Sequence, residues 1–70
     1  MRKNATLPKA IGKKIQKRRK QIGITQEEAA ERAGISRAYM GYIEQGRHAP
    51  SLEVLQKVAK ALKSSMSDFV

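Results

Sequence analysis

The junction Gly34-Ile35-Ser36 constrains this sequence more than any other feature, because it ends one helix and begins the next with a single residue between them. Glycine adopts the left-handed backbone conformation that terminates helices without a Cβ clash, and serine is a strong N-cap. The preceding helix is predicted to begin at Thr25, since Thr25 and Glu28 have the spacing of a capping box. Two short helices must therefore meet at a tight turn.

The side chains expected on the inner faces of these two helices allow close packing. In the first helix they are Ala29, Ala30 and Ala33, all of them small. The second helix is predicted over residues 36–45, ahead of a stop at Gly46, and at about 100° per residue Met40 and Ile43 define its buried side. Its outward side then consists of Arg37, Ala38, Gly41, Tyr42 and Gln45, with Tyr39 on the flank.

Three more helices are predicted around this pair. One runs from about Pro8 to Ile22 and stops at Gly23, and a short one extends from Ser65 to the last residue. Between them, a helix capped by Ser51 carries the clearest amphipathic stripe, which consists of Leu55, Val58, Ala59 and Leu62. We therefore expect an all-α fold of five helices, with a single domain over residues 8–70 behind a basic arm over residues 1–7.

The charge of the chain is high and unevenly distributed. Fifteen Lys and Arg oppose six Asp and Glu, for a formal net charge of +9, and residues 1–20 contain nine bases and no acid. Such an excess indicates a polyanionic partner, with nucleic acid as the first candidate and an anionic membrane surface as the second. A solvated helix face that only keeps the protein soluble is the alternative.

Several classes of function are disfavoured by what the sequence does not contain. It has no Cys, one His and no Gly-rich phosphate loop, so neither a catalytic triad nor a thiolate zinc site can be assembled. We therefore expect no enzyme activity, metal, cofactor or small-molecule ligand. No apolar run approaches the roughly 20 residues of a membrane span, and no secretory signal is recognisable, so a soluble, cytoplasmic protein is expected.

Two short helices with alanines at their crossing and a glycine turn describe a helix-turn-helix. Over residues 19–69 the sequence resembles the lambda-repressor-like domains of phage repressors and bacterial XRE-type regulators. The matching positions are Arg19 four residues before Gly23, Thr25-Gln26, Ala30, Ala33-Gly34-Ile35-Ser36, Ile43-Glu44, Gly46, Pro50-Ser51 and residues 55–62. The pair Arg37-x-Tyr39 also resembles the controller proteins of restriction–modification systems.

In this motif the second helix enters the major groove and its N-terminal residues meet base edges. Arg37 is the expected guanine reader, Ala38 is expected at a thymine methyl, and Gly41 would leave room for close approach. Tyr42 is favoured as a base contact, whereas for Tyr39 a core position and a DNA contact both stay open. Phosphate contacts are expected from Thr25, Gln26, Ser36, Gln45 and Arg47.

The resemblance also implies a partly buried ion pair between Arg19 and Glu44. The lysines of the first helix are expected to act as a long-range attractive field, and His48 is expected to be an ordinary exposed loop residue. A homodimer is expected to bind a two-fold operator, with a contact through Leu62, Met66, Phe69 or Val70.

The predicted function is thus a sequence-specific, double-stranded-DNA-binding transcriptional regulator. The alternative is an antitoxin or other protein-interaction module whose DNA binding is autoregulatory. The operator sequence and the choice between activation and repression stay open.

Overall fold

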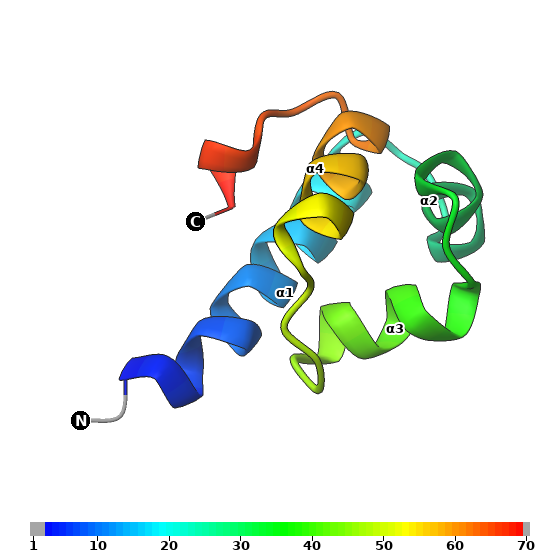
Figure 1. Ribbon diagram of the computed structural model, residues 1–70. Coiled ribbons are helices and arrows are strands. Elements are labelled where there is room, and N and C mark those ends of the chain that lie inside the picture. Colours follow the sequence, from blue (N-terminus) through cyan, green and yellow to red (C-terminus); the bar gives the residue numbers. More distant parts are fainter. Residues whose placement is uncertain (1–2, 70) are drawn as a thin grey trace.

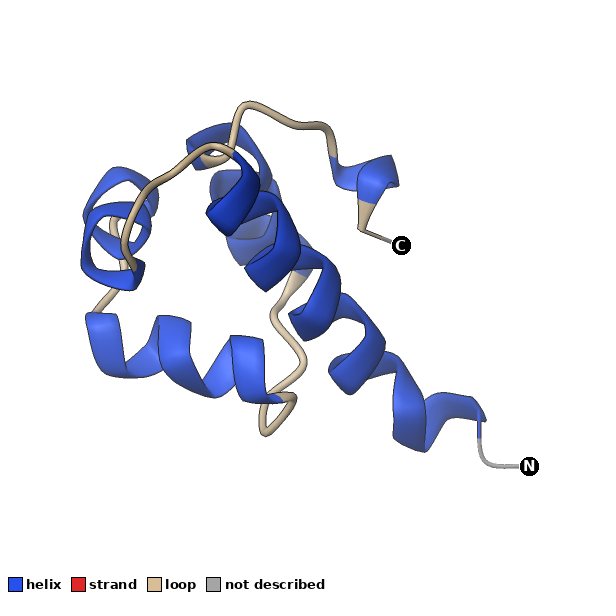
Figure 2. Ribbon diagram, turned by 180° about the vertical axis from the view of Figure 1, so that it is seen from behind, coloured by secondary structure: helices blue, strands red, loops and turns tan. Residues whose placement is uncertain are grey.

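The computed structural model describes residues 3–69 and the side chains of residues 8–69. Within residues 3–69 it contains no strand, one 3₁₀ turn, η1 (Met66–Asp68), and four α-helices, which are α1 (Lys3–Gln21), α2 (Gln26–Ala33), α3 (Arg37–Gln45) and α4 (Leu52–Ala61). Helix α3 packs against both α1 and α2, and α4 packs against α2 and passes in front of α1 (Figure 1). Seen from behind, α1 is the long helix that runs across the face of the molecule (Figure 2).

The predicted N-caps of the last three helices are confirmed. The hydroxyl of Thr25 accepts a hydrogen bond from the Glu28 N–H at 3.0 Å, and the Glu28 carboxylate accepts one from the Thr25 N–H at 3.4 Å. The hydroxyls of Ser36 and Ser51 accept from the backbone N–H three residues later, at 3.0 and 3.1 Å. These caps satisfy N–H groups that no turn of the helix can reach.

Two expectations about the ends of the chain are wrong. Helix α1 begins at Lys3 instead of about Pro8, so residues 3–7, expected to form an arm, are helical. Pro8 is tolerated inside α1 because it removes only one hydrogen bond near the helix start. The expected fifth α-helix is a single 3₁₀ turn, in which the Asp68 carboxylate accepts from the Ser65 N–H at 3.0 Å. Val70 lies outside the described residues.

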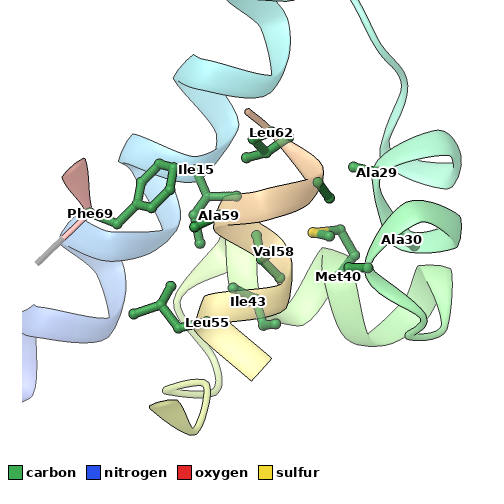
Figure 3. Close-up of a cluster of buried hydrophobic side chains, with 12 residues drawn as sticks. Ile15, Ala29, Ala30, Met40, Ile43, Leu55, Val58, Ala59, Leu62 and Phe69 are labelled. Atoms are coloured by element: carbon green, nitrogen blue, oxygen red, sulfur yellow. The ribbon is translucent and has the colours of Figure 1, made fainter. Parts of the chain in front are cut away.

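The core forms where α1, α3 and α4 converge. Five side chains are fully buried there, namely Ile15, Met40, Ile43, Val58 and Leu62. Figure 3 shows side chains of α4 between those of α1 and those of α3, with Phe69 at the edge beside α1. The predicted stripe of α4 is buried along its whole length. The core therefore joins α1, α3 and α4 through their apolar side chains.

This core corrects the expected dimer contact. Leu62 and Phe69 are 0% and 2% exposed, so both side chains are already covered within one molecule. Met66 is half-buried against the same cluster, and Val70 is outside the described range. The physical reason is that η1 folds back towards α1, so that Phe69 completes the core of the same molecule (Figure 3).

Helix α3 is held against α1 by a backbone contact at Gly12. A Cβ atom placed on Gly12 would lie 2.7 Å from the carbonyl oxygen of Glu44 and closer still to that of Ile43. At the end of α3, a Cβ on Gly46 would lie 2.6 Å from Cγ of Lys9. The two helices therefore approach more closely than any larger residue at these positions would allow.

Candidate nucleic-acid interface

Helices α2 and α3 meet at the turn that the sequence predicts. Gly34 ends α2 with φ +73, and the N–H of Ile35 reaches back to the carbonyl of Ala30 at 3.0 Å. The alanines of α2 are buried, at 0%, 2% and 4% exposed for Ala29, Ala30 and Ala33. Their small size lets α3 cross α2 closely. The glycine turn and the alanine packing therefore favour the same arrangement of the two helices.

The orientation of α3 is secured by a hydrogen-bonded network around Glu44. Arg19 donates to both carboxylate oxygens of Glu44, from Nε at 2.7 Å and from Nη2 at 3.1 Å. Its Nη1 donates to the carbonyl of Ile24 at 3.0 Å, and Gln26 Nε2 donates to Glu44 Oε1 at 3.1 Å. The side chains of Arg19 and Glu44 are 11% and 1% exposed. The network thus joins α1, α2 and the end of α3.

The outward side of α3 agrees with the helical spacing at four of its five expected positions. Arg37, Ala38, Tyr42 and Gln45 are exposed, while Met40 and Ile43 on the opposite side are fully buried. The N-caps Thr25 and Ser36 are exposed beside them, and Gln26 is half-buried. We call this surface the α3 face; it consists of Thr25, Gln26, Ser36, Arg37, Ala38, Tyr42, Gln45 and Arg47.

The expected exposure of Gly41 is wrong. Gly41 is buried, and a Cβ atom at this position would lie 3.6 Å from the amide oxygen of Gln26. The reason is the network described above, because Gln26 reaches across α3 to donate to Glu44 and its side chain covers Gly41. A helical wheel of α3 contains no information about a side chain that arrives from α2.

The loop after α3 packs its side chains onto the two tyrosines. The rings of Tyr39 and Tyr42 lie 6.3 and 5.6 Å from that of His48, and the Arg47 guanidinium carbon lies 5.6 Å from the centre of the Tyr42 ring. Tyr39 is half-buried against the core, whereas Tyr42 is 39% exposed. His48 is therefore a packing partner for both tyrosines. Sequence reasoning missed this role because nothing local links a loop histidine to residues six and nine positions earlier.

Two further residues of α1 escaped prediction. Arg18 donates from Nε to the carbonyl of Leu62 at 3.1 Å and from Nη2 to that of Lys63 at 3.2 Å, so it fastens α1 to the end of α4. Gly12 makes the close approach to α3. A detectable signal existed for Gly12, since a glycine inside a helix, seven residues before Arg19 and hence on the same face, indicates a packing constraint.

In the range from residue 3 to residue 69, no helix is both long and apolar enough to span a membrane. The described side chains also contain no group of three His, Asp or Glu positioned to hold a metal ion. The α3 face has its chemistry in guanidinium, hydroxyl, amide and aromatic groups. These are the groups that hydrogen-bond to base edges and phosphates in protein–DNA complexes.

Comparison with known proteins agrees with this chemistry. A family model described as helix-turn-helix matches residues 15–69. An uncharacterized HTH-type transcriptional regulator of Methanothermobacter thermautotrophicus is 46% identical over 48 residues, which cover 69% of this chain and 70% of that protein. The immunity repressor protein of Bacillus phage phi105 is 42% identical over 60 residues, which cover 86% of this chain and 42% of that repressor. The chain thus spans less than half of the phage repressor.

Among solved structures, the restriction–modification controller protein C.AhdI of Aeromonas hydrophila is similar over nearly its whole length. The TM-score is 0.87 at 28% sequence identity, and the match covers 90% of this chain and 96% of that one. The likeness to controller proteins expected from Arg37 and Tyr39 is therefore confirmed at the level of the fold.

Proposed function

The chain belongs to the XRE-type helix-turn-helix family of DNA-binding transcriptional regulators, and from this premise we propose that it binds a two-fold operator as a homodimer, with α3 in the major groove. The observation that carries the proposal is the division of α3 into two sides. One side is fully buried at Met40 and Ile43, and the other presents Arg37, Ala38, Tyr42 and Gln45 to solvent.

Within the α3 face, each residue has a chemical role in the proposal. Arg37 at the start of α3 pairs with O6 and N7 of a guanine, and Ala38 contacts a thymine methyl. Tyr42 contacts bases from the next turn of α3. Tyr39, half-buried, supports Tyr42 through the ring of His48, so we assign it a positioning role.

Phosphates are held at the two helix starts and in the loop after α3. The exposed caps Thr25 and Ser36 begin α2 and α3, where backbone N–H groups favour anions. Gln26 Nε2 uses one hydrogen on Glu44 and has a second one to donate to a phosphate. Arg47 and Gln45 complete the set. Because Gln26 bonds Glu44 as well, contact with the DNA backbone and the orientation of α3 are linked.

The dimer follows from the small size of the α3 face. One domain of this kind reads only a few base pairs, which is too few for useful specificity. Two copies related by a two-fold axis place their recognition helices about 34 Å apart, one turn of DNA.

Selection of bound duplexes from a random pool tests the proposal, and we expect a two-fold consensus with a guanine in each half-site. A competition titration with Arg37→Ala then tests the reading residue. Loss of a bidentate guanine contact should weaken binding to the consensus by about 5- to 150-fold, and should scarcely affect a duplex that lacks the guanine.

Lys13→Ala is the matched control, since it removes an exposed positive charge from α1 instead of α3. It should weaken binding to all sequences by the same factor. If Arg37→Ala also weakens all sequences equally, then Arg37 is a phosphate contact and the proposed base reading is wrong. Absence of any enriched sequence would contradict the sequence-specific function itself.

A further inference from the structure

Most of the positive charge of the protein lies away from the α3 face. Lys14, Lys17, Arg18 and Lys63 line one open hollow between α1 and η1. Arg32, Lys57, Lys60 and again Lys63 line a second hollow between α2 and α4. We call these seven basic side chains the basic belt. Two acidic residues, Asp68 and Glu31, line the same hollows, which leaves the belt with five net positive charges of the +9 of the chain.

The lysines of the belt are not neutralised by neighbouring carboxylates. Among the described side chains no carboxylate oxygen lies within 4.0 Å of any of these lysines, and Arg32 has only a long pair with Glu28, at 3.8 Å. Asp68 is engaged in closing η1, where it accepts from Ser65. Lys57, Lys60 and Lys63 are all exposed. A surface of this kind has a positive electrostatic potential, which attracts anionic molecules from solution.

The parts of the belt on α1 and at the end of α4 point in a different direction from the α3 face. Gly12 marks the side of α1 that packs on α3, and at about 100° per residue Lys14 and Lys17 lie roughly 160° and 140° from it. The bonds from Arg18 to the carbonyls of Leu62 and Lys63 connect α1 with the end of α4. That end of α4 and the connection to η1 lie on the opposite side of the molecule from α3 in both ribbon views (Figures 1 and 2).

We propose that the basic belt binds a second segment of double-stranded DNA while the α3 face holds the first, so that one protein molecule bridges two duplexes. This inference rests on the proposed function of the α3 face. A single straight duplex cannot serve both surfaces, because the domain is at least 21 Å across and DNA is stiff over that distance, with a persistence length of about 150 base pairs.

The chemistry of the belt favours DNA over other occupants. A second copy of the chain would bring two surfaces of the same charge together, which is repulsive. A lipid bilayer would be expected to receive an apolar side chain from the same surface. The apolar residues that line the two hollows are Phe69, Ala33 and Ala61, and all three are buried. Regularly spaced phosphates suit lysines three residues apart on one helix, as Lys57 and Lys60 are.

The test uses an operator duplex tethered to beads, the protein, and a second, labelled duplex without an operator. The belt variant is Lys57→Gln/Lys60→Gln/Lys63→Gln. The matched control is Lys9→Gln/Lys13→Gln/Lys20→Gln, which removes the same charge from three lysines of α1 that are also exposed. We expect the wild type and the control to retain equal amounts of the labelled duplex for the same amount of protein bound to the operator on the beads. The belt variant should retain at least about tenfold less labelled duplex, because three lysines that contact phosphates are lost. Each lost phosphate contact should also lower the slope of log affinity against log salt by about one.

Operator binding is measured separately for each protein, so that the two proposals fail in distinguishable ways. The belt variant should bind the operator within about threefold of the wild type, with an unchanged melting temperature as evidence of folding. Equal loss in the belt and control variants, or full retention in the belt variant, would overturn the bridging proposal while leaving operator binding intact. Capture of the protein by phosphatidylserine vesicles, without retention of the labelled duplex, would also overturn it. Absence of operator binding by the wild type would instead contradict the proposed function.

Discussion

At the scale of the residue, Glu44 is the most consequential side chain of the protein. It is 1% exposed, yet it accepts two hydrogen bonds from Arg19 and one from Gln26. Among the described residues, no buried side-chain nitrogen or oxygen lacks a hydrogen-bond partner. A buried carboxylate needs this degree of pairing because desolvation of an uncompensated charge is costly. The pair therefore fixes α3 relative to α1 more than it adds stability over an apolar alternative.

Glu44→Ala should lower the free energy of unfolding by about 3 to 5 kcal/mol, because it leaves the Arg19 guanidinium buried without its carboxylate. For a domain of this size that corresponds to a fall in melting temperature of more than about 10 °C. Glu31→Ala, at an exposed site of α2 without a described ion pair, should change the free energy by less than about 0.5 kcal/mol. Thermal unfolding followed by circular dichroism compares the two, and equal small shifts would contradict the prediction.

At the scale of the element, the crossing of α1 and α3 depends on the absence of a side chain at Gly12. Two glycines within helices of this protein have opposite surroundings. A Cβ at Gly12 would overlap backbone carbonyl oxygens, which cannot move aside without shifting α3, whereas one at Gly41 would meet only the flexible amide of Gln26 at 3.6 Å. The same substitution therefore has opposite expected effects at the two sites.

Gly12→Ala should destabilise the protein by about 1 to 3 kcal/mol, the usual cost of overpacking, and should weaken DNA binding by displacing α3. Gly41→Ala should be neutral or stabilising by up to about 1 kcal/mol, since alanine is the better helix former. Urea denaturation measures both free energies. A stabilising Gly12→Ala would show that α1 and α3 are not in backbone contact.

Directly after the C-cap of α4 lies the one described non-glycine residue with positive φ, Lys63 at +56. A left-handed conformation costs a residue with a Cβ about 1 to 2 kcal/mol. Lys63→Gly should therefore stabilise the protein by about 1 kcal/mol, while the Lys63 carbonyl continues to accept from Arg18. Lys63→Ala retains the strained backbone and serves as the control. If thermal unfolding gives the two variants the same melting temperature, strain at this position is not significant.

At the scale of the whole molecule, the structure separates apolar side chains that belong to the core from those that are exposed to solvent. Phe69 is 2% exposed and Leu52 is 71% exposed. The first completes the core beside α1, and the second lies at the start of α4 without cover in one molecule. This distinction changes which substitutions report on folding and which report on association.

Phe69→Ala should lower the free energy of unfolding by about 3 to 5 kcal/mol, with no specific effect on self-association. Leu52→Ser should leave stability within about 0.5 kcal/mol. We expect it to raise the dimer dissociation constant at least about tenfold, because burial of a leucine contributes about 1.5 to 3 kcal/mol. Sedimentation equilibrium measures association and thermal unfolding measures stability. Unchanged association of Leu52→Ser would exclude the start of α4 from the subunit contact.

The sequence by itself determined where α2 and α3 begin and end, where α4 begins, and which sides of these helices are apolar. Caps such as Thr25 with Glu28, and stripes such as that of Leu55 to Leu62, depend on residues within one or two turns of each other, so they can be recognised without knowledge of the rest of the chain. The paired helices and the outward side of α3 followed from these local signals. The Arg19–Glu44 pair needed the family resemblance as well, because its members are 25 residues apart.

Only the tertiary structure decided which side chains from distant segments meet. Gln26 covers Gly41 from 15 positions away, Arg18 fastens carbonyls 44 and 45 residues further along, and His48 packs between tyrosines of α3. The same holds for the commitment of Leu62 and Phe69 to the core and for the convergence of α1 and α4 lysines into one basic belt. These long-range contacts depend on how whole helices pack against each other. The packing is determined by the sum of many contacts, so no single local pattern in the sequence reveals it.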